Sequence, residues 1–381
     1  MKILMVSIPN HHFFQWANQL KDAGYEVYWF DVTDGGPKVS KISWVQQIKG
    51  WKLKINYPFR HAIKNRFPKI DQLIQHYNEN SVAAVFKKKI DDIQPDIVHC
   101  FEMKLAGFPI LGVMERHAKI KFIYSSWGSD LFRFEEMGIS KKEVVPFFDR
   151  VNYLITDCQR DYTIALQNGF KNKFLGVFPG NGGIVIESKN ICSFDKRNKI
   201  LLKGYEDGVG KALPVLEALK KLPISVIKEY EIVIFSADEA VKNKIKQDPF
   251  FTSLNVQIIG RNSFLANEEL LKIMGQAIVY IGSSISDGMP NTVLEAMGMG
   301  AFPIQSNPGG ATEEVITHGV NGFLIANPLD STEIAAWIEK ALANQELRDN
   351  AQKYNVDFVS KNYNRERLKK EIVQLYKGIL S

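Results

Sequence analysis

The chain has 381 residues, of which 45% are hydrophobic and 24% are charged, and its formal net charge is +6. This length is long for one domain and sufficient for two, each with its own hydrophobic core. No segment reaches the ~18 consecutive apolar residues of a membrane-spanning helix, and the amino-terminal MKILMVSIPN is too short for one and lacks a cleavage site. We therefore expect a protein that is neither secreted nor integral to a membrane, with its three cysteines reduced.

The first half of the chain alternates short apolar segments with longer segments of helical periodicity. Strands are predicted at residues 2–8, 25–32, 96–101, 121–126, 152–158 and 174–178. Helices are predicted between them, at residues 12–23, 70–93, 103–116 and 159–169. This alternation is typical of parallel βαβ units.

Residues 37–70 form a basic, aromatic segment within this half, with nine Lys or Arg residues and no acidic residue. It could be a solvated face, a nucleic-acid patch or a membrane-facing surface. No nucleic-acid-binding motif accompanies it, so we expect no nucleic-acid partner. Each basic residue close to an anionic leaflet contributes ~1 kcal/mol, and aromatic rings suit the interface. We expect segment 37–70 to dock on an anionic membrane surface, which predicts a cytoplasmic protein, peripheral on the inner membrane face, with a lipid-linked acceptor.

Residues 185–199 are polar and show neither the periodicity of a helix nor that of a strand, so they are predicted to be a linker. The alternation then restarts, with strands predicted at residues 199–204, 230–236, 256–260, 277–283, 301–306 and 322–327. The expected fold is α/β, with two Rossmann-like doubly wound domains, 1–188 and 189–361, facing a cleft at the carboxyl ends of both sets of strands. Residues 362–381 read as an amphipathic helix, which we expect to pack back on the first domain.

Residues 278–315 are the most informative segment. A buried strand ends at Ser283, a polar loop follows, and Pro290 is predicted at the first helical position, where its fixed φ is favourable. The helix NTVLEAM is expected to stop at Gly298 or Gly300.

A helix that starts at the carboxyl edge of a sheet is an anion site, because its first amides and its dipole favour negative charge. The amides of Asn291 and Thr292 would bind a diphosphate, which Gly288 allows to approach the backbone closely. Glu295 lies ~7 Å farther along the axis, so it suits a ribose hydroxyl better than a phosphate. Asp287 could accept hydrogen bonds from sugar hydroxyls. The alternative is that Asp287 is a turn residue and Glu295 part of a solvated face.

SDGMPNTVLEAMGMG followed by PGGATEEV resembles the signature of the retaining GT-B glycosyltransferases of the GT4 family. The family pattern is Glu-x7-Glu, and here the first acid is Asp287. The resemblance implies that Asp287 contacts the transferred sugar and that Glu295 holds the ribose. It also implies a donor-binding backbone at Gly288, Met289, Pro290, Asn291 and Thr292, followed by a turn with Gly309, Gly310 and either Glu313 or Glu314.

A second donor element is LLKGYEDGVGKALPVLEAL, residues 201–219, which reads as strand, loop and helix. The family places an Arg and a Lys here against the diphosphate, which assigns that role to Lys211 and, in place of the Arg, to Lys203. An ammonium is a sufficient phosphate partner. Two surface lysines are the alternative. Arg261, at the end of another strand, is a candidate contact for the nucleobase edge.

The acceptor half carries a weaker resemblance. YSSWGSDLF, residues 124–132, resembles the family's H-G-S-D element, with Trp127 in place of the histidine. An indole can stack on a sugar but cannot exchange a proton. Gly128 would form a tight loop, and Asp130 is either a catalytic residue or the cap of the following helix.

Further acceptor candidates follow two other predicted strands. PDIVHCFEMKLAG contains His99, which is either a core residue or catalytic, and Glu102, an acceptor-side candidate. SIPNHHFF replaces the glycine-rich loop of many family members and supplies the candidates Asn10, His11 and His12.

The sequence contains no D-x-D or H-E-x-x-H motif, and lysines with helix amides can supply the charge of a metal. We therefore predict a metal-independent enzyme with no cofactor besides a nucleotide-sugar co-substrate. The predicted function is transfer of a sugar to a glycan or lipid-linked acceptor, with retention implied by the resemblance. A catalytically weak carbohydrate- or nucleotide-binding protein and a nucleotide-sugar 2-epimerase are the alternatives, whereas an oxidoreductase would need a Gly-x-Gly-x-x-Gly turn.

Overall fold

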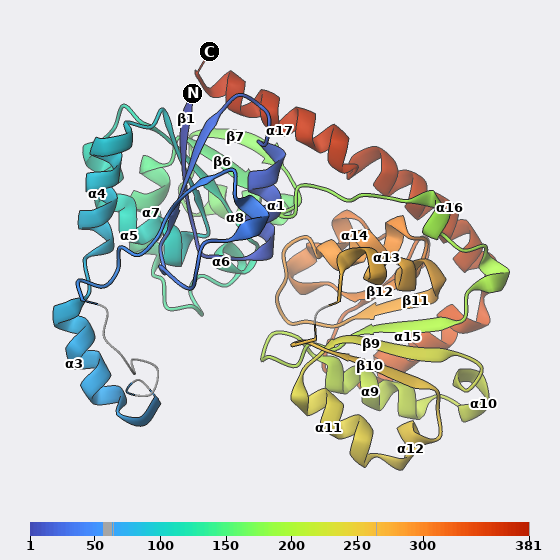
Figure 1. Cartoon of the computed structure of the whole chain (residues 1–381). Helices are drawn as coiled ribbons and strands as arrows, with labels where there is room; N and C mark the ends of the chain where they lie inside the picture. Colours follow the sequence, from blue (N-terminus) through green and yellow to red (C-terminus); the bar gives the residue numbers. More distant parts are fainter. Residues whose placement is uncertain (56–62, 64, 264, 381) are drawn as a thin grey trace. The chain divides into compact units, whose positions relative to one another are not determined.

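The computed structural model describes residues 1–55, 63, 65–263 and 265–380. The chain forms two compact units (Figure 1). Unit 1 contains Met1–Asp157, Asp161–Gly182 and Lys369–Ser381, and unit 2 contains Cys158–Arg160 and Gly183–Leu368. Residues 183–188 and 362–368 thus belong to unit 2, whereas the sequence analysis assigns the former to the first domain and the latter to the returning helix.

Unit 1 is built on a seven-stranded parallel sheet of order β3-β2-β1-β4-β5-β6-β7. Its strands are β1 (Lys2–Ser7), β2 (Glu26–Asp31), β3 (Gln46–Ile48), β4 (Ile97–Phe101), β5 (Lys121–Ser125), β6 (Tyr153–Thr156) and β7 (Lys173–Val177). Its helices are α1 (His11–Gln19), α3 (Pro68–Asn78), α4 (Val82–Ile93), α5 (Phe108–Arg116), α6 (Ser129–Phe132), α7 (Lys141–Arg150), α8 (Gln159–Gln167) and the end of α17 (Arg365–Leu380).

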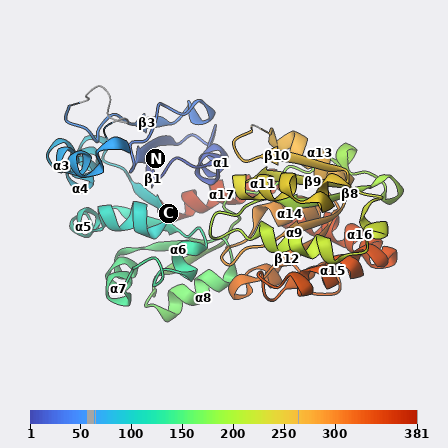
Figure 2. The same cartoon turned by 90° about the horizontal axis from the view of Figure 1, so that it is seen from below.

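Both faces of this sheet are covered by helices (Figures 1 and 2). Leu4 and Val6 of β1 pack with α4, α5 and α7, while Ile3 and Met5 pack with α1 and α17. Two buried faces explain why the strands read as continuous apolar runs. The carboxyl-terminal helix buries Ile372, Tyr376 and Ile379 in the second of these cores.

Two predicted helices differ in the structure. The segment 70–93 is not one helix, because α3 ends at Asn78 and α4 starts only at Val82, after Ser81 adopts an extended backbone and caps the amide of Ala84. The segment 103–116 starts with a π-helical turn, Met103–Gly107, before α5. The edge strand β3 was not predicted, since its three residues are too few for a readable alternation.

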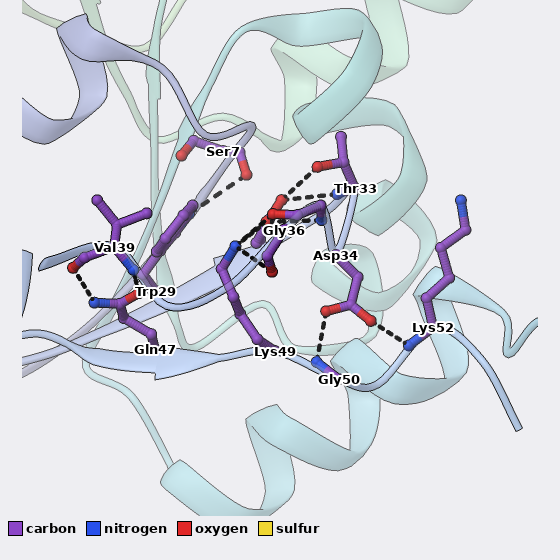
Figure 3. Close-up of polar contacts among 12 residues, drawn as sticks. Ser7, Trp29, Thr33, Asp34, Gly36, Val39, Gln47, Lys49, Gly50 and Lys52 are labelled. Atoms are coloured by element: carbon purple, nitrogen blue, oxygen red, sulfur yellow. Dashed lines mark hydrogen bonds and ion pairs between the residues drawn. The ribbon is translucent and has the colours of Figure 1, made fainter. Parts of the chain in front are cut away.

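The basic segment 37–70 is not one uniform surface, which corrects the sequence interpretation for part of it (Figure 3). Lys49 is buried and forms an ion pair with the buried Asp31 at 2.9 Å. Trp51 is also buried and donates from Nε1 to the carbonyl of Asp31 at 3.0 Å. Asp34 accepts the amides of Gly50 and Lys52 at 2.6 and 2.8 Å. Acids that precede the segment therefore hold its first half against the sheet, while residues 56–62 and 64 lie outside the described residues.

Unit 2 contains a six-stranded parallel sheet of order β10-β9-β8-β11-β12-β13. Its strands are β8 (Lys199–Lys203), β9 (Glu231–Ala237), β10 (Val256–Gly260), β11 (Ala277–Gly282), β12 (Phe302–Ser306) and β13 (Phe323–Ile325). Its helices are α9 (Ala212–Lys221), α10 (Ile224–Ile227), α11 (Glu239–Gln247), α12 (Pro249–Thr252), α13 (Asn267–Gln276), α14 (Asn291–Gly298), α15 (Ser331–Ala343) and α16 (Gln345–Asn362).

This sheet also has a hydrophobic core on each face. One core packs α9 and α15 against Ile200, Ile232 and Ile304, and the other packs α13 and α14 against Leu201 and Val233. Among the helices of the described residues, none is both long enough and apolar enough to cross a membrane.

Candidate active site

The loop and helix that follow β11 have the predicted order, with one correction. Pro290 is not the first helical residue: it has an extended ψ of 102° and precedes α14, which starts at Asn291. Its carbonyl accepts the amide of Val293 at 2.9 Å. The amides of Asn291 and Thr292 precede this first internal bond, so they form the positive end of the helix. The helix ends at Gly298, and Gly300 takes the positive φ of 79° that the turn requires.

Asp287 lies on the loop before α14. Its side chain is half-buried, and burial raises the pKa of its carboxyl group. The positive charges of Lys203 and Arg160 and the amide of Gly288 act in the opposite direction. The guanidinium of Arg160 donates to the carbonyl oxygens of Asp287 and Pro308 at 2.8 and 2.7 Å, which fixes the loop.

Glu314 holds Arg160 in turn. Its carboxylate accepts the amides of Gln159 and Arg160 at 2.8 and 2.9 Å. The neighbouring Glu313 instead accepts from the side chain of Asn307 at 2.8 Å. The sequence left the choice between these two acids open, and the structure assigns them different contacts.

Glu295 lies on α14 beyond the first turn and is half-buried. Burial raises the pKa of its carboxyl group to about 7, against a hydrogen bond from Asn267 and the positive charges of Arg365 and Lys203. A carboxyl group that is costly to ionise and retains an exposed edge can accept a hydrogen bond from a ligand hydroxyl.

Lys203 interacts electrostatically with both Asp287 and Glu295. It ends β8, which is the sheet neighbour of β11, and its charge acts on both Asp287 and Glu295. Its ammonium lies 4.6 Å from the ring centre of Tyr205. Asp287 and Glu295 thus lie on either side of the start of α14, and both are subject to the charge of Lys203.

Arg261 and Lys211 differ in their surroundings. Arg261 stacks on Tyr205 at 4.2 Å and pairs with Asp207 and Asp238 at 2.9 and 3.1 Å, so its charge is already balanced. Lys211 precedes α9, and its amide donates to Ser283 at 2.9 Å, which ties this loop to the end of β11. Among the described residues, no ion pair of its ammonium is found.

The carboxyl edge of unit 1 is built around buried polar groups. His99 is fully buried, with Nδ1 2.6 Å from the hydroxyl of Tyr376 and Nε2 2.8 Å from that of Ser125. Burial lowers the pKa of His99 to about 3, so the imidazole is neutral. Of the two interpretations that the sequence left open, the geometry favours a core histidine.

Asp130 and Glu102 lie close together in the same region. Asp130 is buried and accepts the amides of Trp127 and Met103 at 2.8 and 2.9 Å and the hydroxyl of Tyr124 at 2.6 Å. Three donors give Asp130 a positioning role that fixes Trp127 and the loop of Gly128, whose φ is 78°. The sequence left Asp130 as either a catalytic residue or a helix cap, and these three contacts favour a structural role.

Glu102 has a positive φ of 76°, a strained conformation for a non-glycine residue. It accepts the amides of Lys104 and Leu105. Burial, and then the charge of Asp130, raise the pKa of Glu102 to about 7. Strain together with a shifted pKa at a strand end is typical of a functional position.

The remaining acceptor candidates lie at the start of α1. Asn10 caps this helix by accepting the amide of Phe13 at 2.8 Å. His11 is exposed with Nε2 3.3 Å from the amide nitrogen of Gln15, and His12 is half-buried near Gly180. Sequence reasoning missed Arg160, Asn267 and Arg365, because none of them lies in a motif that marks a ligand site.

Comparisons with known proteins agree with this geometry. Residues 187–357 match the family described as glycosyl transferases group 1, and residues 2–158 match the family described as glycosyl transferase 4-like. An uncharacterized glycosyltransferase of Methanocaldococcus jannaschii, MJ1069, is 24% identical over 317 residues, which are 77% of each chain.

Solved structures share the fold over the whole chain. Sucrose-phosphate synthase from Thermosynechococcus elongatus has a TM-score of 0.72 at 14% identity, covering 100% of this chain and 99% of its own. Anabaena HepE in complex with UDP has a TM-score of 0.69 at 14% identity, covering 99% of this chain and 100% of its own.

Two parallel Rossmann-like sheets, together with the solved structures that share them, define the GT-B fold. Because two glycosyltransferase family models match residues 2–158 and 187–357, the chain is a glycosyltransferase.

Proposed function

We propose that the chain transfers a sugar, with retention at the anomeric carbon, from a nucleotide sugar to a lipid-linked or cell-surface glycan at the cytosolic face of the membrane. The observation that carries the donor part is that Asp287 and Glu295 flank the first amides of α14, with Lys203 at the end of the neighbouring strand β8 acting on both acids through its charge.

Each group of this site has a task in the proposal. Lys203, Lys211 and the first amides of α14 stabilise the diphosphate as its bond to the anomeric carbon breaks. The oxygen of an acceptor hydroxyl then bonds to that carbon, and its proton passes to the departing diphosphate. Asp287 accepts hydrogen bonds from hydroxyls of the sugar, and Glu295 from the ribose. Arg160 keeps the loop of Asp287 in place, so the sugar is oriented before it reacts.

Binding of donors is the first test. Thermal unfolding is measured with UDP-, GDP-, dTDP- and ADP-glucose, starting with UDP because HepE has been solved with UDP-glucose. A donor at about 100 times its Kd should stabilise the protein by about 2.7 kcal/mol. Asp287→Asn should weaken binding of the sugar nucleotide more than that of the free nucleoside diphosphate. Equal loss for both ligands would contradict the sugar contact.

Metal independence is part of the proposal. The charges of Lys203 and Lys211 and the helix amides support it, because they can neutralise the leaving group without an ion. Transfer should persist after the protein is dialysed against EDTA. Loss of transfer that Mg²⁺ or Mn²⁺ restores would contradict it.

Membrane association is supported by α3, which stands apart from the sheet of unit 1 (Figure 1). Phe67, Ile70 and Tyr77 are 51%, 53% and 69% exposed. Ile70 and Tyr77 are seven residues apart and therefore lie on one face of the helix. The exposed Arg66 and Lys69 flank this apolar face. Apolar side chains beside basic ones are the composition of a helix that lies in an anionic lipid interface.

Vesicle sedimentation tests this step. The chain should bind phosphatidylglycerol vesicles at low salt, and Ile70→Ser with Tyr77→Ser should remove most of the binding. Leu166→Ser, which changes an exposed side chain on α8, serves as the control. Equal binding by both variants would contradict a role for α3, and failure of the wild type to bind would contradict membrane docking.

A second candidate function is carbohydrate or nucleotide binding without efficient transfer. It is favoured by Trp127, because this side chain replaces a residue that could exchange a proton. Mass spectrometry of reactions with the stabilising donor decides between the two candidates. Nucleotide release with no glycosylated product from any supplied glycan or lipid acceptor would favour the second candidate, and epimerised donor would indicate a 2-epimerase.

A further inference from the structure

Unit 1 has a cavity of about 610 Å³ at the open edge of its sheet. This volume lies in the range of ~300–1,000 Å³ that is usual for small-molecule sites. The cavity is formed by β3, the residues that precede it, and the end of α4. Tyr28, Trp44, Gln46, Lys89 and Asp92 are among the side chains that line it.

The cavity is separate from the candidate acceptor residues. Trp44 precedes β3, and α4 ends at Ile93 just before β4 starts at Ile97, so both lie toward the amino ends of the parallel strands. Glu102 and Trp127 follow the carboxyl ends of β4 and β5. A ligand in the cavity would therefore occupy a second site on unit 1.

The walls of the cavity are held rigidly. The indole of Trp44 donates from Nε1 to the side chain of Asn18 at 2.9 Å. The side-chain amide of Gln47 accepts from the amide of Val39 and donates to its carbonyl, both at 2.8 Å (Figure 3). A second bond from Gln47 reaches the carbonyl of Ile42 at 3.1 Å. A fixed wall loses little conformational entropy when a ligand binds.

The chemistry of the lining selects against an anion. Asp92 lies 3.5 Å from Lys89 and balances its charge. The carboxyl end of α4 contributes the negative end of its dipole. A phosphate or carboxylate ligand would be repelled by the carboxylate of Asp92 and by the negative end of this dipole. Lys38 is the remaining cation of the lining.

A neutral polyhydroxylated ligand fits the same lining. Tyr28 and Trp44 are half-buried and offer aromatic surface to the apolar face of a sugar ring. Ser40 and Ser43 are exposed and can both donate and accept hydrogen bonds. Gln46 is also exposed; its side-chain nitrogen donates to Glu26 at 3.4 Å, and its side-chain oxygen can accept from a hydroxyl. Asp92 and Lys89 add one charged acceptor and one charged donor for hydroxyl groups.

We propose that this cavity is a second glycan-binding site, which holds sugar units of the acceptor away from the end that reacts. The proposal rests on the proposed function, because it assumes a glycan acceptor of several units. An acceptor that occupies the cavity has a raised effective concentration at the reacting site, provided that the glycan spans the two. Longer glycans should then be better acceptors than short ones.

Fluorine NMR of the full chain labelled with 5-fluorotryptophan tests binding directly. The chain has six tryptophans, among them Trp44 in the cavity, Trp127 at the candidate acceptor site and Trp337 in unit 2. The probes are the methyl glycosides of glucose, galactose, mannose and N-acetylglucosamine at high millimolar concentration. The signal of Trp44, assigned by Trp44→Phe, should shift and saturate with at least one probe while that of Trp337 stays constant.

The variant Gln46→Ala changes an exposed side chain and should raise the apparent Kd of that probe about tenfold, the equivalent of 1.4 kcal/mol. Gln72→Ala, on the exposed face of α3, is the matched control and should leave the Kd unchanged. If no probe shifts Trp44, or if Gln46→Ala leaves its titration unchanged, the cavity is not a sugar site. A shift of Trp127 alone would overturn the cavity proposal and leave the proposed acceptor site intact.

Kinetics separate this proposal from the proposed function. Gln46→Ala should raise KM for a long acceptor and leave both kcat and the KM of a single-sugar acceptor unchanged. An equal KM effect on both acceptors would overturn the second site, whereas failure of the wild type to transfer to either would overturn the proposed function while the NMR result stands.

Discussion

The two units differ in how their buried polar and charged side chains are paired. In unit 1, Asp31 pairs with Lys49, Asp130 accepts three hydrogen bonds, and His99 lies between Tyr376 and Ser125. In unit 2, Asp287 and Glu295 are half-buried and have raised pKa values although the charge of Lys203 lowers both. Burial also raises the pKa of Asp130, but its three donors hold the surrounding loops, whereas Asp287 and Glu295 keep exposed edges toward which a ligand could donate.

This difference indicates which polar residues of each unit are candidates for a functional role. A polar residue at the end of a strand is informative only once its partners are known, and in unit 1 most partners come from the same unit. Glu102 is the exception there, because it combines a strained backbone with a pKa of about 7. We therefore expect substitutions in unit 1 to change stability, and substitutions in unit 2 to change catalysis.

The largest expected effect is on the ion pair of unit 1. Lys49→Met leaves the carboxylate of the fully buried Asp31 without its cation, which should lower the free energy of unfolding by about 3–5 kcal/mol. Lys52→Met breaks a partly exposed pair with Glu79 and should cost less than about 1 kcal/mol. Urea unfolding at neutral pH measures both. Equal effects would mean that burial does not distinguish the two lysines.

The next effect is on catalysis in unit 2. Lys203→Met removes the cation whose charge acts on both acids, and kcat should fall by about 100- to 1,000-fold, as for the loss of one donor to a developing negative charge. Stability should stay close to that of the wild type. Lys246→Met, at an exposed position of α11, is the control. A variant that lost stability but retained kcat would reverse the comparison between the two units.

A smaller effect is expected for Tyr376→Phe. The change leaves Nδ1 of the buried His99 and Nε1 of the buried Trp16 without the hydroxyl that contacts both, at a cost of about 1–3 kcal/mol. Tyr25→Phe removes a half-exposed hydroxyl that donates to Val373 on the same helix at 2.9 Å, so it is a matched control with a smaller cost. Thermal unfolding of the two variants measures the difference. A larger loss for Tyr25→Phe would show that the contact with His99 adds little.

The donor site could be read from the sequence because its signals are local. Gly288, Pro290 and Gly300 mark the turns, and the period of NTVLEAM predicts the helix, so the positions of Asp287 and Glu295 follow. The fold of both units was predictable for the same reason, since each strand carries its own apolar run. The start of this helix was predicted one residue too early, at Pro290, because a proline can occupy either the N-cap or the first helical position.

The remaining features depend on contacts between distant residues. Arg160 reaches Asp287 from a segment 127 positions away, and no pattern near either residue indicates this. Lys49 looks like part of a basic surface until Asp31, 18 residues earlier, is placed beside it by the pairing of β2 and β3. Similarly, the sequence leaves Asp130 open between a catalytic residue and a helix cap, and only the tertiary structure shows its three donors. Composition predicts charge, but only the tertiary structure shows which charges are already paired.

Glu295→Gln sharpens the comparison through pH. The pKa of Glu295 is about 7 in the folded chain and 4.5 for an ordinary glutamate, so between these values the folded state binds more protons than the unfolded state. Ionisation of Glu295 therefore costs stability as the pH rises through this window, and the cost is greatest above pH 7. The uncharged glutamine removes that cost, so the variant should gain stability over the wild type at about pH 8 and gain nothing at about pH 4.

The affinity of Glu295→Gln for the donor should fall about tenfold at the higher pH, which corresponds to 1.4 kcal/mol. Thermal unfolding across this range, with the exposed Glu339→Gln as control, measures the first effect, and calorimetry with the stabilising donor measures the second. Higher stability together with weaker binding is the outcome that identifies an acid kept for its ligand. If both quantities fell, Glu295 would belong with Asp31 and Asp130, as a group that stabilises its own unit.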